Sequence, residues 1–348
     1  MFSQPWATVL FFLGITSPAV SKSTLGLIDT LVASGASQFA SFIQSDPDVL
    51  QLYLSGEFQT VFAPFDAASY NITLQERDLS PMQRQQAAFQ AASGETSLGV
   101  ASRTLPGSVL ETADQSSLLD GQGQRIVIDT RPANVTLLPR RWNSQFNLRR
   151  TPNNSTSSLL KITTGLGNTT NVIKGDIPFD GGLIHITDSY FTLPQSLSST
   201  SQATGQTSFA GLLSKSNMTN TLDSTHSVTV FLPSNAAFST TNTTTTVPEL
   251  LSNHVVAGTV NYLPDLKDGS ILTTQRGETL AISVRNGIYY VNGARITQAN
   301  IVLTNGVAHV VDKVLTPKPQ VPVSASTKTM ALTRTLGMVT SIALLLLI

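Results

Sequence analysis

The chain has 348 residues, with 21 Lys and Arg side chains against 21 Asp and Glu, four His and no Cys. Its length suits two ordinary domains, and 41% apolar residues are enough to build cores, which excludes a disordered chain. Only 12% of the residues are charged, so a nucleic-acid partner is not expected, since phosphate binding depends on clustered Lys and Arg. The absence of Cys excludes a disulfide scaffold, a thiolate metal site and a Cys nucleophile.

The N-terminus has the pattern of a secretory signal peptide. Residues 6–15 form an apolar run of about ten residues, and small side chains follow at Ser17, Ala19 and Ser21. No Lys or Arg precedes the run, so the amino terminus alone supplies positive charge. We predict that residues 1–21 are a signal peptide, and the alternative is a buried N-terminal helix.

Two segments share one pattern and indicate an internal repeat. Residues 60–69 read TVFAPFDAAS, and residues 229–238 read TVFLPSNAAF. Each pattern predicts a buried strand that ends at proline, because proline cannot donate to a sheet. Asp66 or Asn235 then stands where it could cap a helix that begins at the two alanines.

A second pair of segments also matches. Residues 176–188 read DIPFDGGLIHITD, and residues 300–312 read NIVLTNGVAHVVD. Gly-Gly or Asn-Gly between alternating apolar residues is a strong signal for a hairpin turn. We therefore predict that each repeat opens with a strand, turn and helix and closes with a hairpin.

The first repeat is the longer one, by about 45 residues between the corresponding motifs. We assign the extra length to an insertion around residues 135–160, which is expected to be a surface loop. Four arginines lie in it, at positions Arg140, Arg141, Arg149 and Arg150. They are either solvated or contact acidic glycans or phospholipid headgroups.

The C-terminus has the pattern of a glycosylphosphatidylinositol anchor signal. Residues 336–348 form an apolar tail that is shorter than the roughly 20 residues needed to span a bilayer. A polar spacer precedes the tail, and the small residues Ser324, Ala325 and Ser326 precede the spacer. We predict a Pro-rich stalk at 318–323, attachment at Ser324 and a signal over 324–348. The alternatives are a tail-anchored helix and a buried strand.

The chain contains Asn-x-Ser/Thr sequons, which fit an exported protein whose solubility comes from glycans instead of charge. They begin at Asn71, Asn134, Asn153, Asn154, Asn168, Asn217 and Asn242.

The paired motifs, TVFxPxxAA near the start and NGVAHVVDKVLTP at the end, resemble the two signature blocks of the fasciclin domain family. Between them, residues 250–258 are similar to the family's central segment: His254 matches its His, and Asn253 stands where Tyr is usual. The first repeat lacks this His, and residues 103–107 are its candidate remnant. The resemblance implies two tandem α+β domains, at 22–194 and 207–317, joined by a linker at 195–206. Each is expected to be a wedge of short strands packed with several helices.

The resemblance also implies a role and candidate contacts. Fasciclin-like proteins are mostly extracellular adhesion or matrix proteins, often anchored by a glycolipid, with no common catalytic centre. An Asp-Ile pair before the closing hairpin is a reported contact in the family; Asp176 and Ile177 match it, whereas Asn300 replaces the acid in the second repeat. Residues 174–176 read Lys-Gly-Asp, either an integrin-type tripeptide or a plain turn.

The histidines have structural interpretations beside functional ones. His185 and His309 fall at equivalent positions in alternating apolar strands, which favours satisfied structural side chains over ligands or bases. His254 is expected to hold the central segment by hydrogen bonds, with partner contact as the alternative.

The predicted function is extracellular adhesion, or organisation of the matrix or cell wall, at the outer face of the plasma membrane. Expected partners are matrix, cell-wall glycans or surface proteins, and the membrane through a lipid anchor. No catalytic signature, metal site or cofactor site is present in the sequence, so none is predicted. Alternatives are a carbohydrate- or lipid-binding module and, less favoured, a wall-modifying hydrolase.

Overall fold

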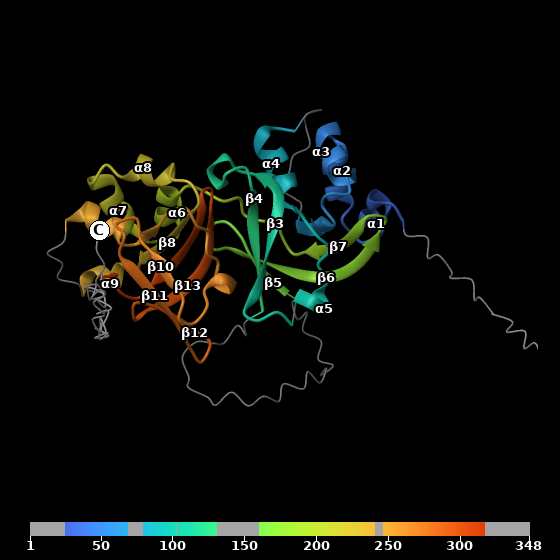
Figure 1. Ribbon diagram of the computed structural model, residues 1–348. Coiled ribbons are helices and arrows are strands. Elements are labelled where there is room, and N and C mark those ends of the chain that lie inside the picture. Colours follow the sequence, from blue (N-terminus) through green and yellow to red (C-terminus); the bar gives the residue numbers. More distant parts are fainter. Residues whose placement is uncertain (1–24, 69–78, 102, 131–159, 241–245, 317–348) are drawn as a thin grey trace, which may run out of the picture. The chain divides into compact units, whose positions relative to one another are not determined.

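The computed structural model describes residues 25–68, 79–101, 103–130, 160–240 and 246–316 (Figure 1). Strands and helices are interspersed along the described chain, and the predicted α+β class is confirmed. We call residues 25–194 the first half and residues 195–316 the second half. Each half contributes seven strands, which are arranged in the same cyclic order.

The strands of the first half close into a barrel in the order of the sequence. They are β1 (Thr60–Pro64), β2 (Ala91–Ala92), β3 (Gly107–Gln115), β4 (Gly123–Asp129), β5 (Leu160–Thr163), β6 (Thr169–Phe179) and β7 (Gly182–Thr187). β1 closes the barrel by pairing in parallel with β7, while the other pairs are antiparallel.

The strands of the second half follow the same neighbour order, β10-β11-β12-β13-β14-β8-β9, as an open sheet. They are β8 (Val228–Pro233), β9 (Val255–Val256), β10 (Ile271–Thr273), β11 (Thr279–Arg285), β12 (Ile288–Val291), β13 (Ala294–Leu303) and β14 (Gly306–Val311). β8 pairs in parallel with β14, as β1 does with β7.

Short helices cover these sheets. In the first half they are α1 (Leu27–Ala33), α2 (Ser37–Gln44), α3 (Pro47–Leu54), η1 (Asp66–Ala68), α4 (Pro81–Phe89), α5 (Leu98–Ala101) and η2 (Ser117–Leu119). In the second half they are α6 (Leu197–Ala203), α7 (Thr207–Lys215), α8 (Thr219–Asp223), α9 (Asn235–Ser239), α10 (Val247–Ser252) and η3 (Leu263–Asp265). No helix in the described part of the chain is both long and apolar enough to cross a bilayer.

The predicted closing hairpins are confirmed at β6–β7 and β13–β14. In each hairpin the second strand begins at a glycine, Gly182 or Gly306. The backbone of this glycine lies against the neighbouring strand segment. A side chain at Gly182 would collide with the carbonyl oxygen of Gln59, and one at Gly306 with that of Val228. Both glycines are therefore required by close backbone approach.

Asp66 and Asn235 were predicted to cap the helices that follow them, and this prediction is wrong. Helix α9 is capped by Ser234, whose side chain accepts from the N–H of Ala237. Asp66 and Asn235 instead reach back to the preceding helices: Asp66 Oδ1 accepts from Gln38 N at 2.8 Å, and Asn235 Oδ1 accepts from Ser208 N at 2.9 Å. They satisfy the free N–H groups at the starts of α2 and α7.

The expected linker at 195–206 is largely a helix. Ser196 caps α6, and its buried residues are Leu197, Thr200 and Ser201. α6 packs on α7 as α1 packs on α2, so this segment occupies the same place in the second half as α1 in the first. The small hydroxyl side chains on its buried face are tolerated because they are hydrogen-bonded, as Ser201 is to the carbonyl of Leu197.

Described residues of the two halves contact one another within one unit of the structure. The carbonyl of Thr304 accepts from Ser116 Oγ at 2.9 Å and from Gln124 Nε2 at 2.8 Å. Val127 shares a small buried cluster with Tyr262 and its neighbours. The halves are therefore joined by side-chain packing as well as by the chain.

Candidate functional site

The closing hairpin of the first half carries the predicted contact residues Asp176 and Ile177. β6 and β7 form an antiparallel hairpin in which β6 ends beside α1 (Figure 1), and their register shifts between Val172 and Ile177. Asp176 lies at the shift with a left-handed backbone, φ 54°, which Asp and Asn tolerate better than most residues. Asn300 has the same conformation, φ 62°, at the corresponding shift in β13.

The bulge presents the carboxylate of Asp176 at the surface. Its Oδ1 accepts from Leu98 N at 2.8 Å, at the first residue of α5. Its own N–H donates to Nδ1 of His185 at 3.3 Å. The acid is thus exposed and held in place from two sides.

Ile177 behaves differently from its neighbour. It is half-buried and packs against the core cluster of the first half, so it anchors the bulge more than it projects from it. The Asp-Ile pair therefore divides into one solvent-facing charge and one packing residue.

The Lys-Gly-Asp tripeptide, residues 174–176, lies within β6 and not in a turn of the hairpin. A side chain on Gly175 would collide with Leu98 and with the ring of His185. The backbone here is consequently fixed by packing, while Lys174 is exposed beside Asp176.

His185 is a buried structural side chain. Its Nε2 lies 2.8 Å from the carbonyl oxygen of Thr96, and its ring packs on the ring of Phe62 with centroids 5.4 Å apart. Nδ1 accepts from Asp176 N, so the ring is neutral with the proton on Nε2. Burial lowers its pKa, in keeping with that state.

His309 repeats this arrangement in the second half. Its Nε2 lies 3.0 Å from the carbonyl oxygen of Asn261, and Asn300 N donates to Nδ1 at 3.4 Å. The ring stacks on Phe231 with centroids 5.6 Å apart. Both histidines join the closing hairpin to a loop, and neither faces solvent.

His254, a predicted contact residue, is also buried. Its Nδ1 donates to the carbonyl of Leu250 at 2.7 Å, and its Nε2 accepts from Leu315 N at 2.8 Å. Burial lowers its pKa to about 4, so it is neutral at pH 7. Its hydrogen bonds hold the central segment to the end of the domain, and a direct partner contact is not available in this conformation.

The counterpart of His254 in the first half is Gln90, and the assignment to residues 103–107 is wrong. Gln90 precedes β2 as His254 precedes β9, and its Oε1 accepts from Phe191 N at 2.9 Å. Gly107, by contrast, begins β3. Sequence reasoning missed Gln90 because it sought an imidazole, whereas the position requires a buried side chain that accepts from one backbone N–H and donates to one backbone carbonyl.

Two predicted sequons lie on the described surface. Asn168 and Asn217 are both exposed, and Asn217 follows the end of α7. The remaining positions lie outside the described residues: Ser324, Asn71, Asn134, Asn153, Asn154 and Asn242.

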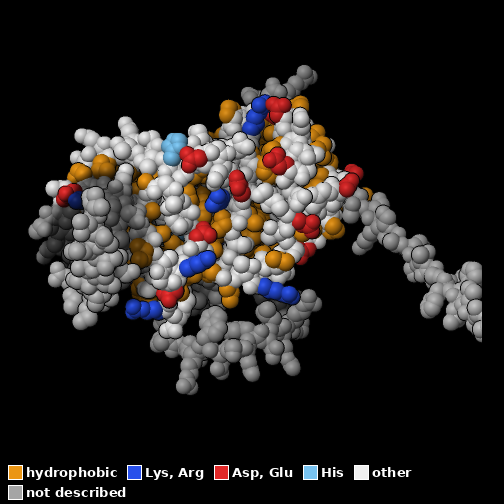
Figure 2. Space-filling model, in the orientation of Figure 1, with side chains coloured by type: hydrophobic (Ala, Val, Ile, Leu, Met, Phe, Trp, Pro, Cys, Tyr) orange, Lys and Arg blue, Asp and Glu red, His pale blue; other side chains and the backbone are white. Residues whose placement is uncertain are grey.

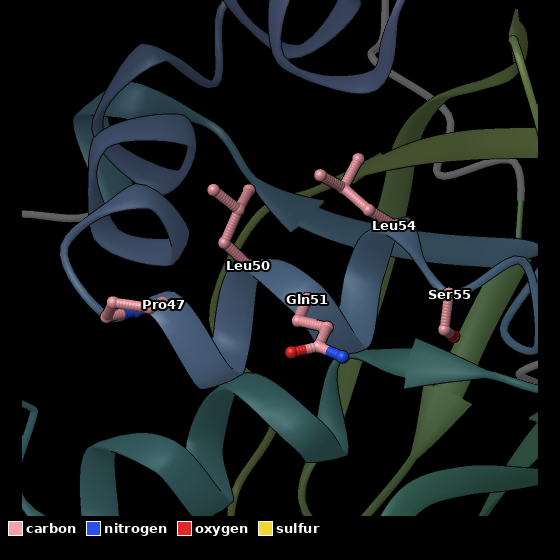
Figure 3. Close-up of a pocket in the computed structure, with 5 residues that line it drawn as sticks. All are labelled: Pro47, Leu50, Gln51, Leu54 and Ser55. Atoms are coloured by element: carbon pink, nitrogen blue, oxygen red, sulfur yellow. The ribbon is translucent and has the colours of Figure 1, made fainter.

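A shallow hollow lies along one face of α3, lined by Pro47, Leu50, Gln51, Leu54 and Ser55 (Figure 3). It holds no charged or titratable side chain, so it offers no acid, base or nucleophile stronger than a hydroxyl. Within the described ranges, no group of three or more His, Asp or Glu could hold a metal ion.

Comparison with known proteins gives a match to a family model and several similar proteins. Residues 204–317 match the Fasciclin domain family model. The chain is 35% identical over 159 residues to a fasciclin-like arabinogalactan protein of Arthroderma benhamiae, covering 44% of this chain and 38% of that protein. It is 34% identical over 165 residues to fasciclin-like arabinogalactan protein CTB11 of Cercospora beticola, covering 45% and 44%.

More distant similarities extend to animals. A 71-residue stretch is 39% identical to Stabilin-2 of Rattus norvegicus, covering 20% of this chain and 5% of that protein. A solved structure of a FAS1 domain pair from the insect cell adhesion molecule Fasciclin I covers 82% of this chain and 98% of its own, with 16% identity and a TM-score of 0.36. The chain matches less than half the length of the two fungal relatives above.

Proposed function

We propose that the protein is an extracellular interaction module that helps organise a cell surface or wall, on the basis of the match between residues 204–317 and the Fasciclin domain family model. The similarity to fungal fasciclin-like arabinogalactan proteins supports a surface location. Neutral charge and scattered ionic groups (Figure 2) fit contacts made by shape and a few placed charges, in place of broad electrostatic attraction.

The observation that carries the proposal is the exposed carboxylate of Asp176. It stands on a backbone fixed by Leu98 and His185, so binding would cost little conformational entropy. The second half offers no equivalent charge, because Asn300 is neutral and only 2% exposed. Contact through this bulge is therefore assigned to the first half.

The test is Asp176→Asn, which removes the charge and keeps the fold. Asparagine tolerates the left-handed backbone and can accept from Leu98 N, as Asn300 Oδ1 accepts from Leu263 N at 2.7 Å. We expect binding of the purified chain to cells or wall fragments to fall about tenfold, the effect of one charge-assisted contact.

The control is Asp180→Asn, the same change of charge at an exposed position four residues along the same hairpin. Equal losses in both variants would mean that net charge, and not this bulge, governs binding. Unchanged binding by Asp176→Asn, with an unchanged unfolding midpoint, would remove Asp176 from the interaction.

We also propose that the chain is exported and lipid-anchored at Ser324, with glycans on exposed sequons such as Asn168 and Asn217. Anchored copies would multiply weak single contacts. Mass spectrometry of the mature protein tests this, since it reports both processed ends and the modifications. A mature chain that retains residues 336–348 would contradict the anchor.

A further inference from the structure

The outer face of β11–β13 carries side chains that neither the core nor the hairpin site uses. Along β11, Leu280, Ile282 and Val284 belong to a core cluster of the second half or pack against it. The alternate residues Ser283 and Arg285 therefore point to the opposite side of the sheet. The register places Ser283 opposite Tyr290 of β12, and Tyr290 opposite Arg295 of β13.

Two arginines flank the ring of Tyr290 on this face. The guanidinium carbon of Arg285 lies 5.7 Å from the ring centroid, in cation–π range. Arg295 stands on the next strand, with its Cβ expected about 5 Å from that of Tyr290. We call Arg285, Tyr290 and Arg295 the arginine–tyrosine platform.

The charges of the platform are not neutralised within the described chain. Arg285 and Arg295 make no ion pair with a described acid, whereas Arg276 of the same half pairs with Glu249 at 2.9 Å. The Nε of Arg295 is buried and has no hydrogen-bond partner among the described residues. A buried donor without a partner is costly. Because this nitrogen is closed to solvent, an acceptor from outside would have to bind the remainder of the Arg295 guanidinium.

Two acids border the platform, and both are engaged with the backbone. Asp268 Oδ1 accepts from Val284 N at 2.7 Å, and Asp312 Oδ1 accepts from Arg295 N at 2.7 Å. Asp312 stands beside Arg295 and reduces the positive potential there. The platform is therefore moderately positive, which favours a ligand that adds ring contact to charge.

We propose that the arginine–tyrosine platform binds an acidic polysaccharide bearing carboxylates. A sugar ring can pack beside the half-buried ring of Tyr290 while its carboxylate bonds to a guanidinium, which matches carboxylate geometry. β11 and β13 are two strand spacings apart, about 10 Å, so the two arginines suit acid groups on separate sugar units and not one small anion. The inference stands apart from Asp176, because the platform lies in the other half of the chain.

The experiment is titration calorimetry of the purified chain with oligogalacturonate, with a neutral β-glucan oligosaccharide and a heparin oligosaccharide as separate arms. We expect saturable binding of oligogalacturonate, weakened by added salt, and none of the neutral sugar. Arg285→Gln and Arg295→Gln should each weaken binding about tenfold. Tyr290→Thr, which keeps a strand-forming side chain, should weaken it several-fold.

Arg276→Gln is the matched control, because its charge is already paired with Glu249, and it should bind as the parent does. Asp312→Asn should strengthen binding about twofold, since it removes the acid beside Arg295. The proposal would be overturned if Arg276→Gln lost as much affinity as the platform variants, or if the neutral sugar bound as tightly as oligogalacturonate. A preference for heparin that Tyr290→Thr leaves unchanged would also overturn it. Unfolding midpoints within a few degrees of the parent show that the variants are folded.

Discussion

The two halves of this molecule share a set of hydrogen bonds from buried side chains to the backbone, which we call the polar frame. Some positions of the frame carry the same residue in both halves, and others carry different residues. In the first half Thr60 Oγ1 donates to Gly94 O at 2.6 Å and accepts from Thr96 N at 3.0 Å. In the second half Thr229 Oγ1 makes the same pair of bonds, to Thr259 O and from Asn261 N, both at 2.8 Å. The frame serves buried backbone groups, and those must be satisfied whatever the surrounding sequence.

Where the halves differ, the hydrogen bonds are kept, and burial decides whether a charged side chain is tolerated. Gln90 and His254 both accept a backbone N–H from the end of their domain. Asp176 and Asn300 both accept from the start of a short helix, but Asp176 is exposed and Asn300 is 2% exposed. A carboxylate is tolerated at the first position and an amide at the second because burying a charge is costly. Recognition by charge is therefore open only to the first bulge.

The largest effect should come from the glycines that the two hairpins share. Gly182→Ala and Gly306→Ala each place a methyl group against a carbonyl oxygen, so we expect each to lower the free energy of unfolding by at least about 3 kcal/mol. Gly211→Ala in α7 is the control: it meets no atom within 4 Å and should stabilise by about 0.5–1 kcal/mol. Urea unfolding measures all three. Tolerance of one hairpin substitution would show that the two turns are not equivalent.

Acid should destabilise the chain through His254, whereas Gln90, its counterpart in the first half, does not titrate. The folded pKa of His254 is about 4, below its ordinary value, because the charged ring is excluded from the core. Between these two pKa values, His254 therefore binds a proton in the unfolded chain but not in the folded chain. Stability is full above the ordinary pKa, about 6.5, and falls by about 3 kcal/mol as pH drops to 4.

His254→Gln, which installs the side chain of the first half, should remove this part of the acid dependence. Urea unfolding at pH 7.5 and pH 4 measures it. A parent-like difference between the two pH values in the variant would mean that His254 is not the group that titrates.

Asp114 of β3 gives the opposite pH dependence in the first half. Burial raises its pKa to about 6, against the smaller opposing effect of a hydrogen bond from Gln85 at 3.0 Å. The folded state disfavours the carboxylate, so stability is lost as pH rises from about 4 through 6. Asp114→Asn should stabilise the chain by about 3 kcal/mol at pH 7.5 and have little effect at pH 4. A gain that is the same at both pH values would show that packing, and not charge, is responsible.

The sequence predicted what local signals specify. The strands at residues 60–64 and 228–233 and both glycine turns follow from short patterns of apolar alternation, proline and glycine. Helix α6 was missed because its apolar content is low: it begins at a Ser cap, and its buried face is Leu197 together with two hydroxyl side chains. Asp66 and Asn235 were assigned to the wrong helices because a cap chosen by neighbourhood in sequence ignores helices that pack from elsewhere.

The candidate sites divide in the same way. Asp176 was found from its motif, whereas its rigid setting depends on Leu98 and His185, which lie far from one another along the chain. The arginine–tyrosine platform has no linear signature at all. It depends on the register of three strands, which only the folded sheet determines.

The smallest expected effect concerns the shared threonines, and it tests whether the frame is equivalent in both halves. Thr60→Val and Thr229→Val keep the shape of a buried β-branched side chain but remove one donor and one acceptor. Each leaves a loop carbonyl and a backbone N–H to find water at a partly buried position, so we expect a loss of about 1 kcal/mol from either change. Thr30→Val is the control and should cost less, because the Thr30 hydroxyl bonds to the carbonyls of Leu25 and Gly26, just before α1. Urea unfolding measures all three variants. A large loss of stability at one threonine and none at the other would mean that only one loop depends on this hydroxyl. The two halves would then share the geometry of the frame but not its contribution to stability.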